Sequence, residues 1–168
     1  MSAPPEPADH LTVRIKVNGV DREVKVESRL LLVHLIREVL GLRATHIVCD
    51  TGHCGTCTLL LDGTPVRSCT VFAAQAHDRQ VMTPEGLARG ERLHPIQDAF
   101  WEQRGLACGF CTPGMMLSAY GLLQGNPAPT EAEIRRGIAG NLCRCMNYTD
   151  IVNAISAAAG KLLEKDGH

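Results

Sequence analysis

The sequence has few aromatic residues and no block of charge of one sign. Phe, Tyr and Trp make up 4% of its 168 residues, while 45% are hydrophobic, so any core must be mostly aliphatic. The formal net charge is −1, and the basic residues form no cluster. Nucleic acid is therefore not expected as a partner.

Long apolar stretches are missing as well. The longest runs, such as Leu30–Val33, are far too short to span a membrane. The opening MSAPPEPADH has neither the basic nor the apolar region of a signal peptide, and its Pro-rich, polar composition predicts a disordered tail over residues 1–10. We expect a cytoplasmic protein with no membrane span.

Several signatures of catalysis and nucleotide binding are also absent. The sequence contains no G-x-G-x-x-G, Walker loop, H-E-x-x-H or G-x-S-x-G, so we predict no catalytic residues on this chain. Cysteine, in contrast, occurs eight times. In a cytoplasmic protein, metal binding or redox chemistry explains that number better than a disulfide framework does.

The first half of the chain predicts two β-hairpins. Residues Leu11–Glu27 alternate between apolar and polar side chains around Asn18–Gly19, a pair suited to a type I′ turn. Residues Cys57–Cys69 predict a second hairpin that turns at Asp62–Gly63.

A helix is expected between the two hairpins. Residues Arg29–Leu40 have a broad apolar face, Ser28 is a candidate cap, and Gly41 follows the last turn. A short strand is also expected near Gln80–Met82. These elements predict a small α+β domain over residues 11–82, and the pattern changes at the TPEG sequence that follows.

The second half predicts helices with short links. Pro113 suits a first helical position, and Thr130 with Glu133 forms a capping box at another helix start. We therefore expect an α+β protein in which a helical domain spans residues 83–165. The expected helices cover residues 94–105, 112–125, 130–140 and 148–165.

The eight cysteines fall into two groups of four. The first group has the spacing C-x4-C-x2-C-x11-C and the second has C-x2-C-x31-C-x-C. Four thiolates are the ligands of a [2Fe–2S] cluster, and C-x4-C-x2-C is the plant-type ferredoxin spacing. The sequence therefore predicts two clusters. The first would be held by Cys49, Cys54, Cys57 and Cys69, and the second by Cys108, Cys111, Cys143 and Cys145.

Different local structures are expected to hold the two groups. A loop around a cluster must turn tightly and aim N–H groups at sulfide, which suits Gly52 and Gly55 because glycine tolerates a positive φ. In the second group, Cys111, Cys143 and Cys145 precede predicted helix starts. The positive ends of the helix dipoles would stabilise an anionic cluster there.

The sequence disfavours two other kinds of cysteine site. Structural zinc also uses four cysteines, but neither C-x4-C-x2-C nor C-x-C is ordinary zinc-finger spacing, and disulfides do not suit the compartment. A Rieske centre needs two histidines, yet the first group already supplies four thiols. We therefore expect His46 and His53 to be ordinary loop residues, and His34 and Met115 to pack rather than to bind metal.

The sequence resembles the small iron–sulfur subunits of the molybdenum hydroxylases, the xanthine oxidase family. The resemblance covers roughly residues 11–162 and rests on CDTGHCGTCTLLLDGTPVRSC, ACGFCTPGMM and GNLCRCMNY. Bacterial enzymes with separate subunits look most similar, among them dehydrogenases of carbon monoxide, N-heteroaromatic compounds and aldehydes. The resemblance implies a ferredoxin-like β-grasp domain followed by a four-helix [2Fe–2S] domain.

The resemblance also implies a division of labour. The molybdopterin cofactor and the substrate would sit on a large subunit, and FAD on a medium subunit, in a heterotrimer or a dimer of heterotrimers. Electrons would pass from molybdenum through the cluster of the helical domain, with Cys145 nearest the pterin, and then through the other cluster to FAD or another acceptor.

The chain departs from the family pattern at two positions. Ala107 stands where the family often has a glutamine that contacts the pterin, and Asn147 stands where a glycine is usual. The pterin contact is therefore lost or replaced, whereas the turn can survive because Asn tolerates a positive φ better than most residues.

The sequence is also compatible with two other functions. A freestanding ferredoxin-like electron carrier would be monomeric and stable alone, whereas a subunit would purify with larger chains or expose an apolar face. A zinc-stabilised interaction module would be distinguished by metal analysis.

Overall fold

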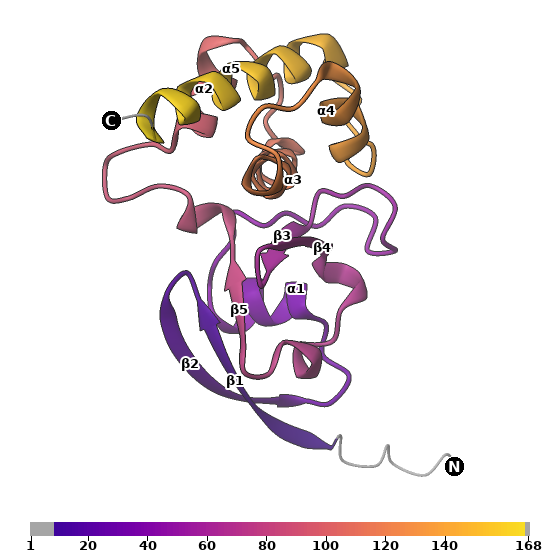
Figure 1. Ribbon diagram of the computed structural model, residues 1–168. Helices are drawn as coiled ribbons and strands as arrows, with labels where there is room; N and C mark the ends of the chain where they lie inside the picture. The colour runs from indigo at the N-terminus through magenta and orange to yellow at the C-terminus, as the bar shows by residue number, and fades with distance from the viewer. Residues whose placement is uncertain (1–8, 167–168) are drawn as a thin grey trace.

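The computed structural model describes residues 9–166 (Figure 1). A mixed sheet forms the N-terminal half, and its strand order is β2-β1-β5-β3-β4. β1 pairs antiparallel with β2 and parallel with β5, while β3 pairs antiparallel with β4 and β5. The strands are β1 His10–Val17, β2 Val20–Glu27, β3 Thr58–Leu61, β4 Thr64–Arg67 and β5 Arg79–Met82.

Both predicted hairpins are confirmed, and their turns explain the sequence signals. Asn18 and Gly19 have φ values of 50° and 82°, and Asp62 and Gly63 have 48° and 79°, so each turn uses two left-handed residues. Both hairpins therefore turn where a left-handed Asn or Asp is followed by glycine.

The predicted helix over residues 29–40 is shorter than expected, and Ser28 does not cap it. Leu31 is extended and forms a bridge with Phe72, so the helix α1, Leu32–His34, begins only after it. Residues Leu35–Val39 continue as a π-helical turn. The cause is tertiary pairing, because the Leu32 N–H donates to Val71 O and holds the preceding segment against a distant part of the chain.

The second half is helical, as predicted. Thr130 and Glu133 form the expected capping box, and Pro113 lies in the first turn of its helix. None of the helices among residues 9–166 combines the length and the apolar character needed to cross a membrane. The helices are α2 Pro95–Glu102, α3 Thr112–Gly125, α4 Glu131–Gly137 and α5 Tyr148–Asp166, and short 3-10 turns cover Ser68–Thr70, Ala73–Ala76 and Pro84–Gly86.

The two halves share one apolar core. Buried side chains from the sheet, such as Leu59 and Leu61, belong to the same cluster as Leu117 and Ile155 from the helices. All four residues of β3 are buried. Helix α3 lies against this strand (Figure 1), and a Cβ at Gly121 would overlap Pro65, so the helix and the hairpin approach without a gap.

Candidate functional site

All eight cysteines lie within the described residues, and none of them forms a disulfide there. Cys49 and Cys54 lie in the loop between the π-helical turn and β3, and Cys57 directly precedes that strand. Cys69 lies in the 3-10 turn after β4. The loop that carries Cys49 and Cys54 runs along the boundary between the two halves, where it faces the helical half (Figure 1).

The loop around Cys49 is built to direct backbone N–H groups at sulfur. Gly52 and Gly55 have φ values of 80° and 70°, as their predicted role requires, and Asp50 has a positive φ of 53° that the sequence did not reveal. The Cys54 N–H donates to Cys49 Sγ over 3.4 Å. Together with the N–H of Thr51, it lowers the pKa of Cys49 to about 5, so the loop favours a thiolate there.

Cys57 and Cys69 form the buried pair of the first group, 3% and 4% exposed. Burial, followed by the hydrogen bond with Cys57, raises the pKa of Cys69 to about 12, while the N–H of Gly52 opposes that rise. The charge of Cys49 also acts on Cys69. The first group therefore gathers in one place as two pairs, Cys49 with Cys54 and Cys57 with Cys69.

The second group gathers at helix starts. Cys111 is the N-cap of α3, and Cys143 and Cys145 precede the first residue of α5, Tyr148. The Cys143 N–H donates to the Tyr148 hydroxyl over 3.0 Å, which ties this segment to the helix. The predicted placement at helix ends is thus observed.

Pairs also form in the second group. Cys145 Sγ lies 3.5 Å from Cys108 Sγ, and both residues are exposed. Burial and then the hydrogen bond with Cys143 raise the pKa of Cys111 to about 12. The N–H of Phe110 lowers the pKa of Cys108, while Cys108 in turn raises that of Cys145. The pairs are Cys108 with Cys145 and Cys111 with Cys143.

This pairwise arrangement fits the group that the spacings predict. A [2Fe–2S] cluster has two irons with two protein ligands each, so it needs two thiol pairs side by side. Backbone N–H groups aimed at the sulfurs suit its negative charge. In the described part of the chain, no three His, Cys, Asp or Glu side chains surround a single metal-ion position.

Three histidines of the sheet half lie outside the thiol pairs. His53 contacts Thr51, and His34 lies 3.9 Å from Asp50. His46 does more than was predicted, because its ring stacks on Phe110 at 4.4 Å and its Nδ1 lies 2.8 Å from Phe110 O. A loop residue of the sheet half thus holds the Cys108–Cys111 loop of the helical half. Met115 is 1% exposed, so it packs as predicted.

Two residues that join the cysteine loops had no signal in the sequence beyond their place in the GNLCRCMNY motif. Asn141 is 4% exposed and donates from Nδ2 to Gly55 O over 2.9 Å. Tyr148 donates its hydroxyl to Asn141 O over 2.8 Å. Their partners are distant in sequence, so only the fold shows what they do.

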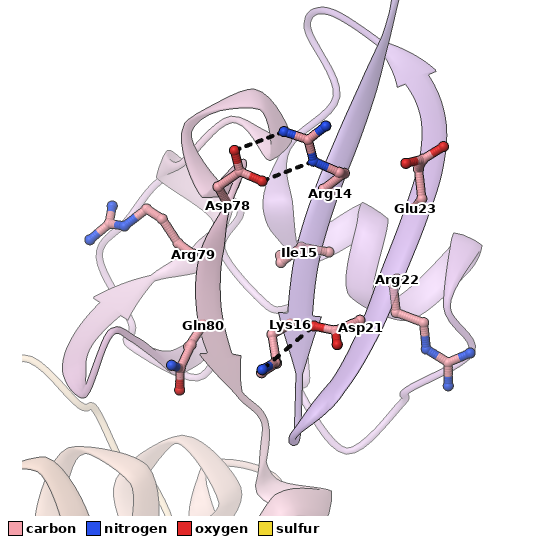
Figure 2. A pocket seen from close by; sticks show the side chains of 9 residues that line it. All are labelled: Arg14, Ile15, Lys16, Asp21, Arg22, Glu23, Asp78, Arg79 and Gln80. Atoms are coloured by element: carbon pink, nitrogen blue, oxygen red, sulfur yellow. Dashed lines mark hydrogen bonds and ion pairs between the residues drawn. The ribbon is translucent and has the colours of Figure 1, made fainter.

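A charged groove lies on the outer surface of the sheet (Figure 2), and none of the eight cysteines lines it. Arg14 and Asp78 form a two-bonded ion pair at 3.0 Å across β1 and the start of β5. Lys16 and Asp21 pair between β1 and β2 at 3.6 Å. Opposite charges alternate there, so the groove favours no ion of one sign.

Family models match both halves of the chain. A 2Fe-2S iron-sulfur cluster binding domain matches residues 15–88, and a [2Fe-2S] binding domain matches residues 83–156. The matched ranges contain the first and the second cysteine group, respectively. The chain therefore carries two [2Fe–2S] domains.

Curated relatives and a solved structure match nearly the full length. The chain is 42% identical to the nicotine 6-hydroxylase small subunit of Paenarthrobacter nicotinovorans, over 97% of this chain and 98% of the relative. It is 43% identical to the caffeine dehydrogenase subunit gamma of Pseudomonas sp. (strain CBB1), over 88% and 90%. A chain of quinoline 2-oxidoreductase from Pseudomonas putida 86 superposes with a TM-score of 0.88 at 43% identity, over 92% and 97%. The chain therefore belongs to the small iron–sulfur subunits of the molybdenum hydroxylases, where it is the electron-transfer subunit of an oxidoreductase.

Proposed function

We propose that this chain carries electrons in a fixed order between two partner subunits. They enter from a molybdopterin centre on the large subunit, pass the cysteine group of the helical half, then that of the sheet half, and leave to FAD on a medium subunit. The observation that carries the proposal is the gathering of eight thiols into two sites of two pairs each.

The residues assigned to the clusters follow from those pairs. A bound [2Fe–2S] cluster supplies one-electron redox chemistry. Residues 11–82 form the ferredoxin-like domain and residues 83–165 the four-helix domain. Cys49, Cys54, Cys57 and Cys69 hold the first cluster, while Cys108, Cys111, Cys143 and Cys145 hold the second.

Exposure supports the assignment of the second group to the large subunit. Cys108 and Cys145 are exposed, whereas Cys57 and Cys69 are buried, so the outer pair of the second group is the accessible edge of the relay. Exposed apolar side chains flank cysteines of both groups. They are Val48, Phe110 and Leu142. A large subunit that covers them would exclude water from the clusters, which also tunes their potentials.

The rest of the complex follows the family pattern. The large subunit converts the substrate. The complex is a heterotrimer or a dimer of heterotrimers, and it is located in the cytoplasm. Ala107 and Asn147 are exposed and lie close to cysteines of the second group in the sequence, so a pterin on the large subunit can reach both positions.

Iron analysis and EPR of the purified complex test this proposal. We expect about four irons per chain and two distinct signals after dithionite reduction, because the two sites differ in exposure and in hydrogen bonds to sulfur. About two irons per chain, or one signal that carries all the spin, would refute the two-cluster relay.

A further inference from the structure

A backbone hydrogen bond joins residues at the two cysteine groups. The Leu142 N–H donates to Cys54 O over 2.8 Å, and Leu142 directly precedes Cys143. A segment that holds the first proposed cluster therefore contacts a segment that holds the second through this hydrogen bond. This contact is one of those that set the distance between the two redox centres.

The side chain of Asn141 holds that contact from within the core. Its Nδ2 donates to Gly55 O over 2.9 Å and lies 3.3 Å from Thr58 Oγ1, while its Oδ1 accepts from Ser118 Oγ over 2.7 Å. One buried amide thus links the first cysteine loop, the start of β3 and the middle of α3. With its donors and its acceptor partnered, such a buried network is rigid.

The main chain beside Asn141 is held as well. Tyr148 donates to Asn141 O and accepts from the Cys143 N–H, so one hydroxyl spans both residues that flank Leu142. The loop around Gly55 is closely packed on this side. A Cβ at Gly55 would overlap Gly140 O and crowd Asn141, and one at Gly114 would lie 2.7 Å from Gly55 O.

We propose that Asn141 is a positioning residue for electron transfer between the two clusters. It fixes the Cys54–Leu142 contact, and with it the distance and the bonded path between the two sites. The proposal rests on the proposed function. One electron leaves the reduced centre of the helical half, which is oxidised, and reduces the oxidised centre of the sheet half, with no bond made or broken.

Asparagine suits this place because the site needs donors and an acceptor from one planar group. Gly55 O offers only lone pairs, so it requires an N–H, while Ser118 donates its hydroxyl. Asn141→Asp keeps the shape but sets a carboxylate oxygen against the Gly55 carbonyl. Electron tunnelling weakens steeply as a gap widens, so a loosened contact slows transfer without removing either cluster.

The experiment compares the purified complex carrying Asn141→Asp with the wild type. Asn126→Asp is the matched control, because that half-buried residue follows the end of α3 opposite to Cys111, and its side chain contacts Ala128 and Glu133 rather than a cysteine loop. Iron content and both EPR signals should be retained. Hydrogen exchange of the peptide spanning residues 138–143 should quicken about tenfold, because residue 141 no longer donates to Gly55 O and local opening therefore costs less.

Two readouts report the positioning itself. In the fully reduced variant, the magnetic interaction between the two EPR signals should weaken. After a pulse of methyl viologen radical, re-equilibration of the electron between the clusters should slow severalfold, whereas the control behaves as wild type. Unchanged coupling and unchanged re-equilibration, with both clusters present, would overturn the proposal for Asn141 and leave the proposed function intact.

A second variant keeps the test decisive if Asn141→Asp fails to fold. Ser118→Ala removes only the donor to Asn141 Oδ1, so both clusters should remain and the same readouts should move less in the same direction. No effect of Ser118→Ala on coupling or re-equilibration would then reject the proposal. Absence of two signals in the wild type would instead reject the proposed function.

Discussion

The loop around Cys49 and the helix starts around Cys111 gather the same number of thiols by different means. The first relies on a backbone bent through left-handed residues and closes over a buried pair, Cys57 and Cys69. The second uses the ends of α3 and α5 and leaves Cys108 and Cys145 exposed. A loop shields its centre by itself, whereas helix ends leave a centre open to a partner.

The largest effect is expected from separating the two sites by mutation. Cys145→Ser replaces a soft thiolate with a poorly ionised hydroxyl, so the second cluster should be lost while the signal of the first remains. Turnover of the complex should fall by more than the ~100-fold that loss of an outer-shell partner can cost. EPR and steady-state rates measure both effects.

Cys57→Ser tests the first cluster in the same way. It should remove the EPR signal of the first cluster and leave the signal of the second cluster, which Cys145→Ser abolishes. If either variant abolished both signals, or Cys145→Ser kept normal turnover, the assignment of cysteines to clusters or the order of the relay would be wrong.

A second prediction compares two glycines with positive φ. Gly109, with φ 83°, has open space where a Cβ would lie, so Gly109→Ala should destabilise the fold by about 1–2 kcal/mol. Gly55, with φ 70°, faces Gly140 O and Asn141, so Gly55→Ala should cost about 2–5 kcal/mol because overlap adds to strain. Urea unfolding of the two variants measures the difference, and equal costs would contradict the close approach of the two loops.

A third prediction concerns loss of clusters in the isolated chain. The site with exposed Cys108 and Cys145 should bleach first in air or ferricyanide, because oxidation follows exposure of sulfur. The cluster at the buried Cys57 and Cys69 should be lost more slowly. Binding of the large subunit should reduce the difference between the two rates of loss. EPR spectra taken during oxidation record the order of loss. Earlier loss of the first cluster would contradict the view that its loop shields it better.

The smallest effect is expected from the ion pair on the outer sheet surface, which touches neither site. Hydrogen bonding to Arg14 lowers the pKa of Asp78, so the pair stabilises the fold above the unfolded-state pKa and this contribution is lost as pH falls through the lower folded-state value. NMR titration should give a pKa for Asp78 below 3.8. Asp78→Asn should change stability only slightly, because exposed pairs are screened, and should leave both EPR signals untouched.

Sequence patterns predicted those parts of the molecule that depend on near neighbours. Alternation and the pairs Asn18–Gly19 and Asp62–Gly63 located the hairpins, and the capping box at Thr130 located the start of α4. The helix expected from Arg29 was wrong at its start, since Leu31 pairs instead with Phe72, a residue no local rule would select.

The site divides in the same way. Spacing was enough to sort the cysteines into groups, because ligand count and loop geometry are local properties. Which thiols pair was not predictable, nor was the role of Asn141, because Ser118, Gly55 and Thr58 reach it only through the fold. His46 was expected to be an ordinary loop residue for the same reason, although it stacks on Phe110.

The burial of β3 has a consequence for anyone who would reuse this electron carrier. Leu60 is covered because α3 packs against one side of the strand, so a chain cut after residue 82 would expose this leucine to water. The excised piece should aggregate rather than behave as a small ferredoxin. In gene fusions and transplants, the smallest exchangeable module is therefore the pair of halves together, with the connection between its two redox centres transferred intact.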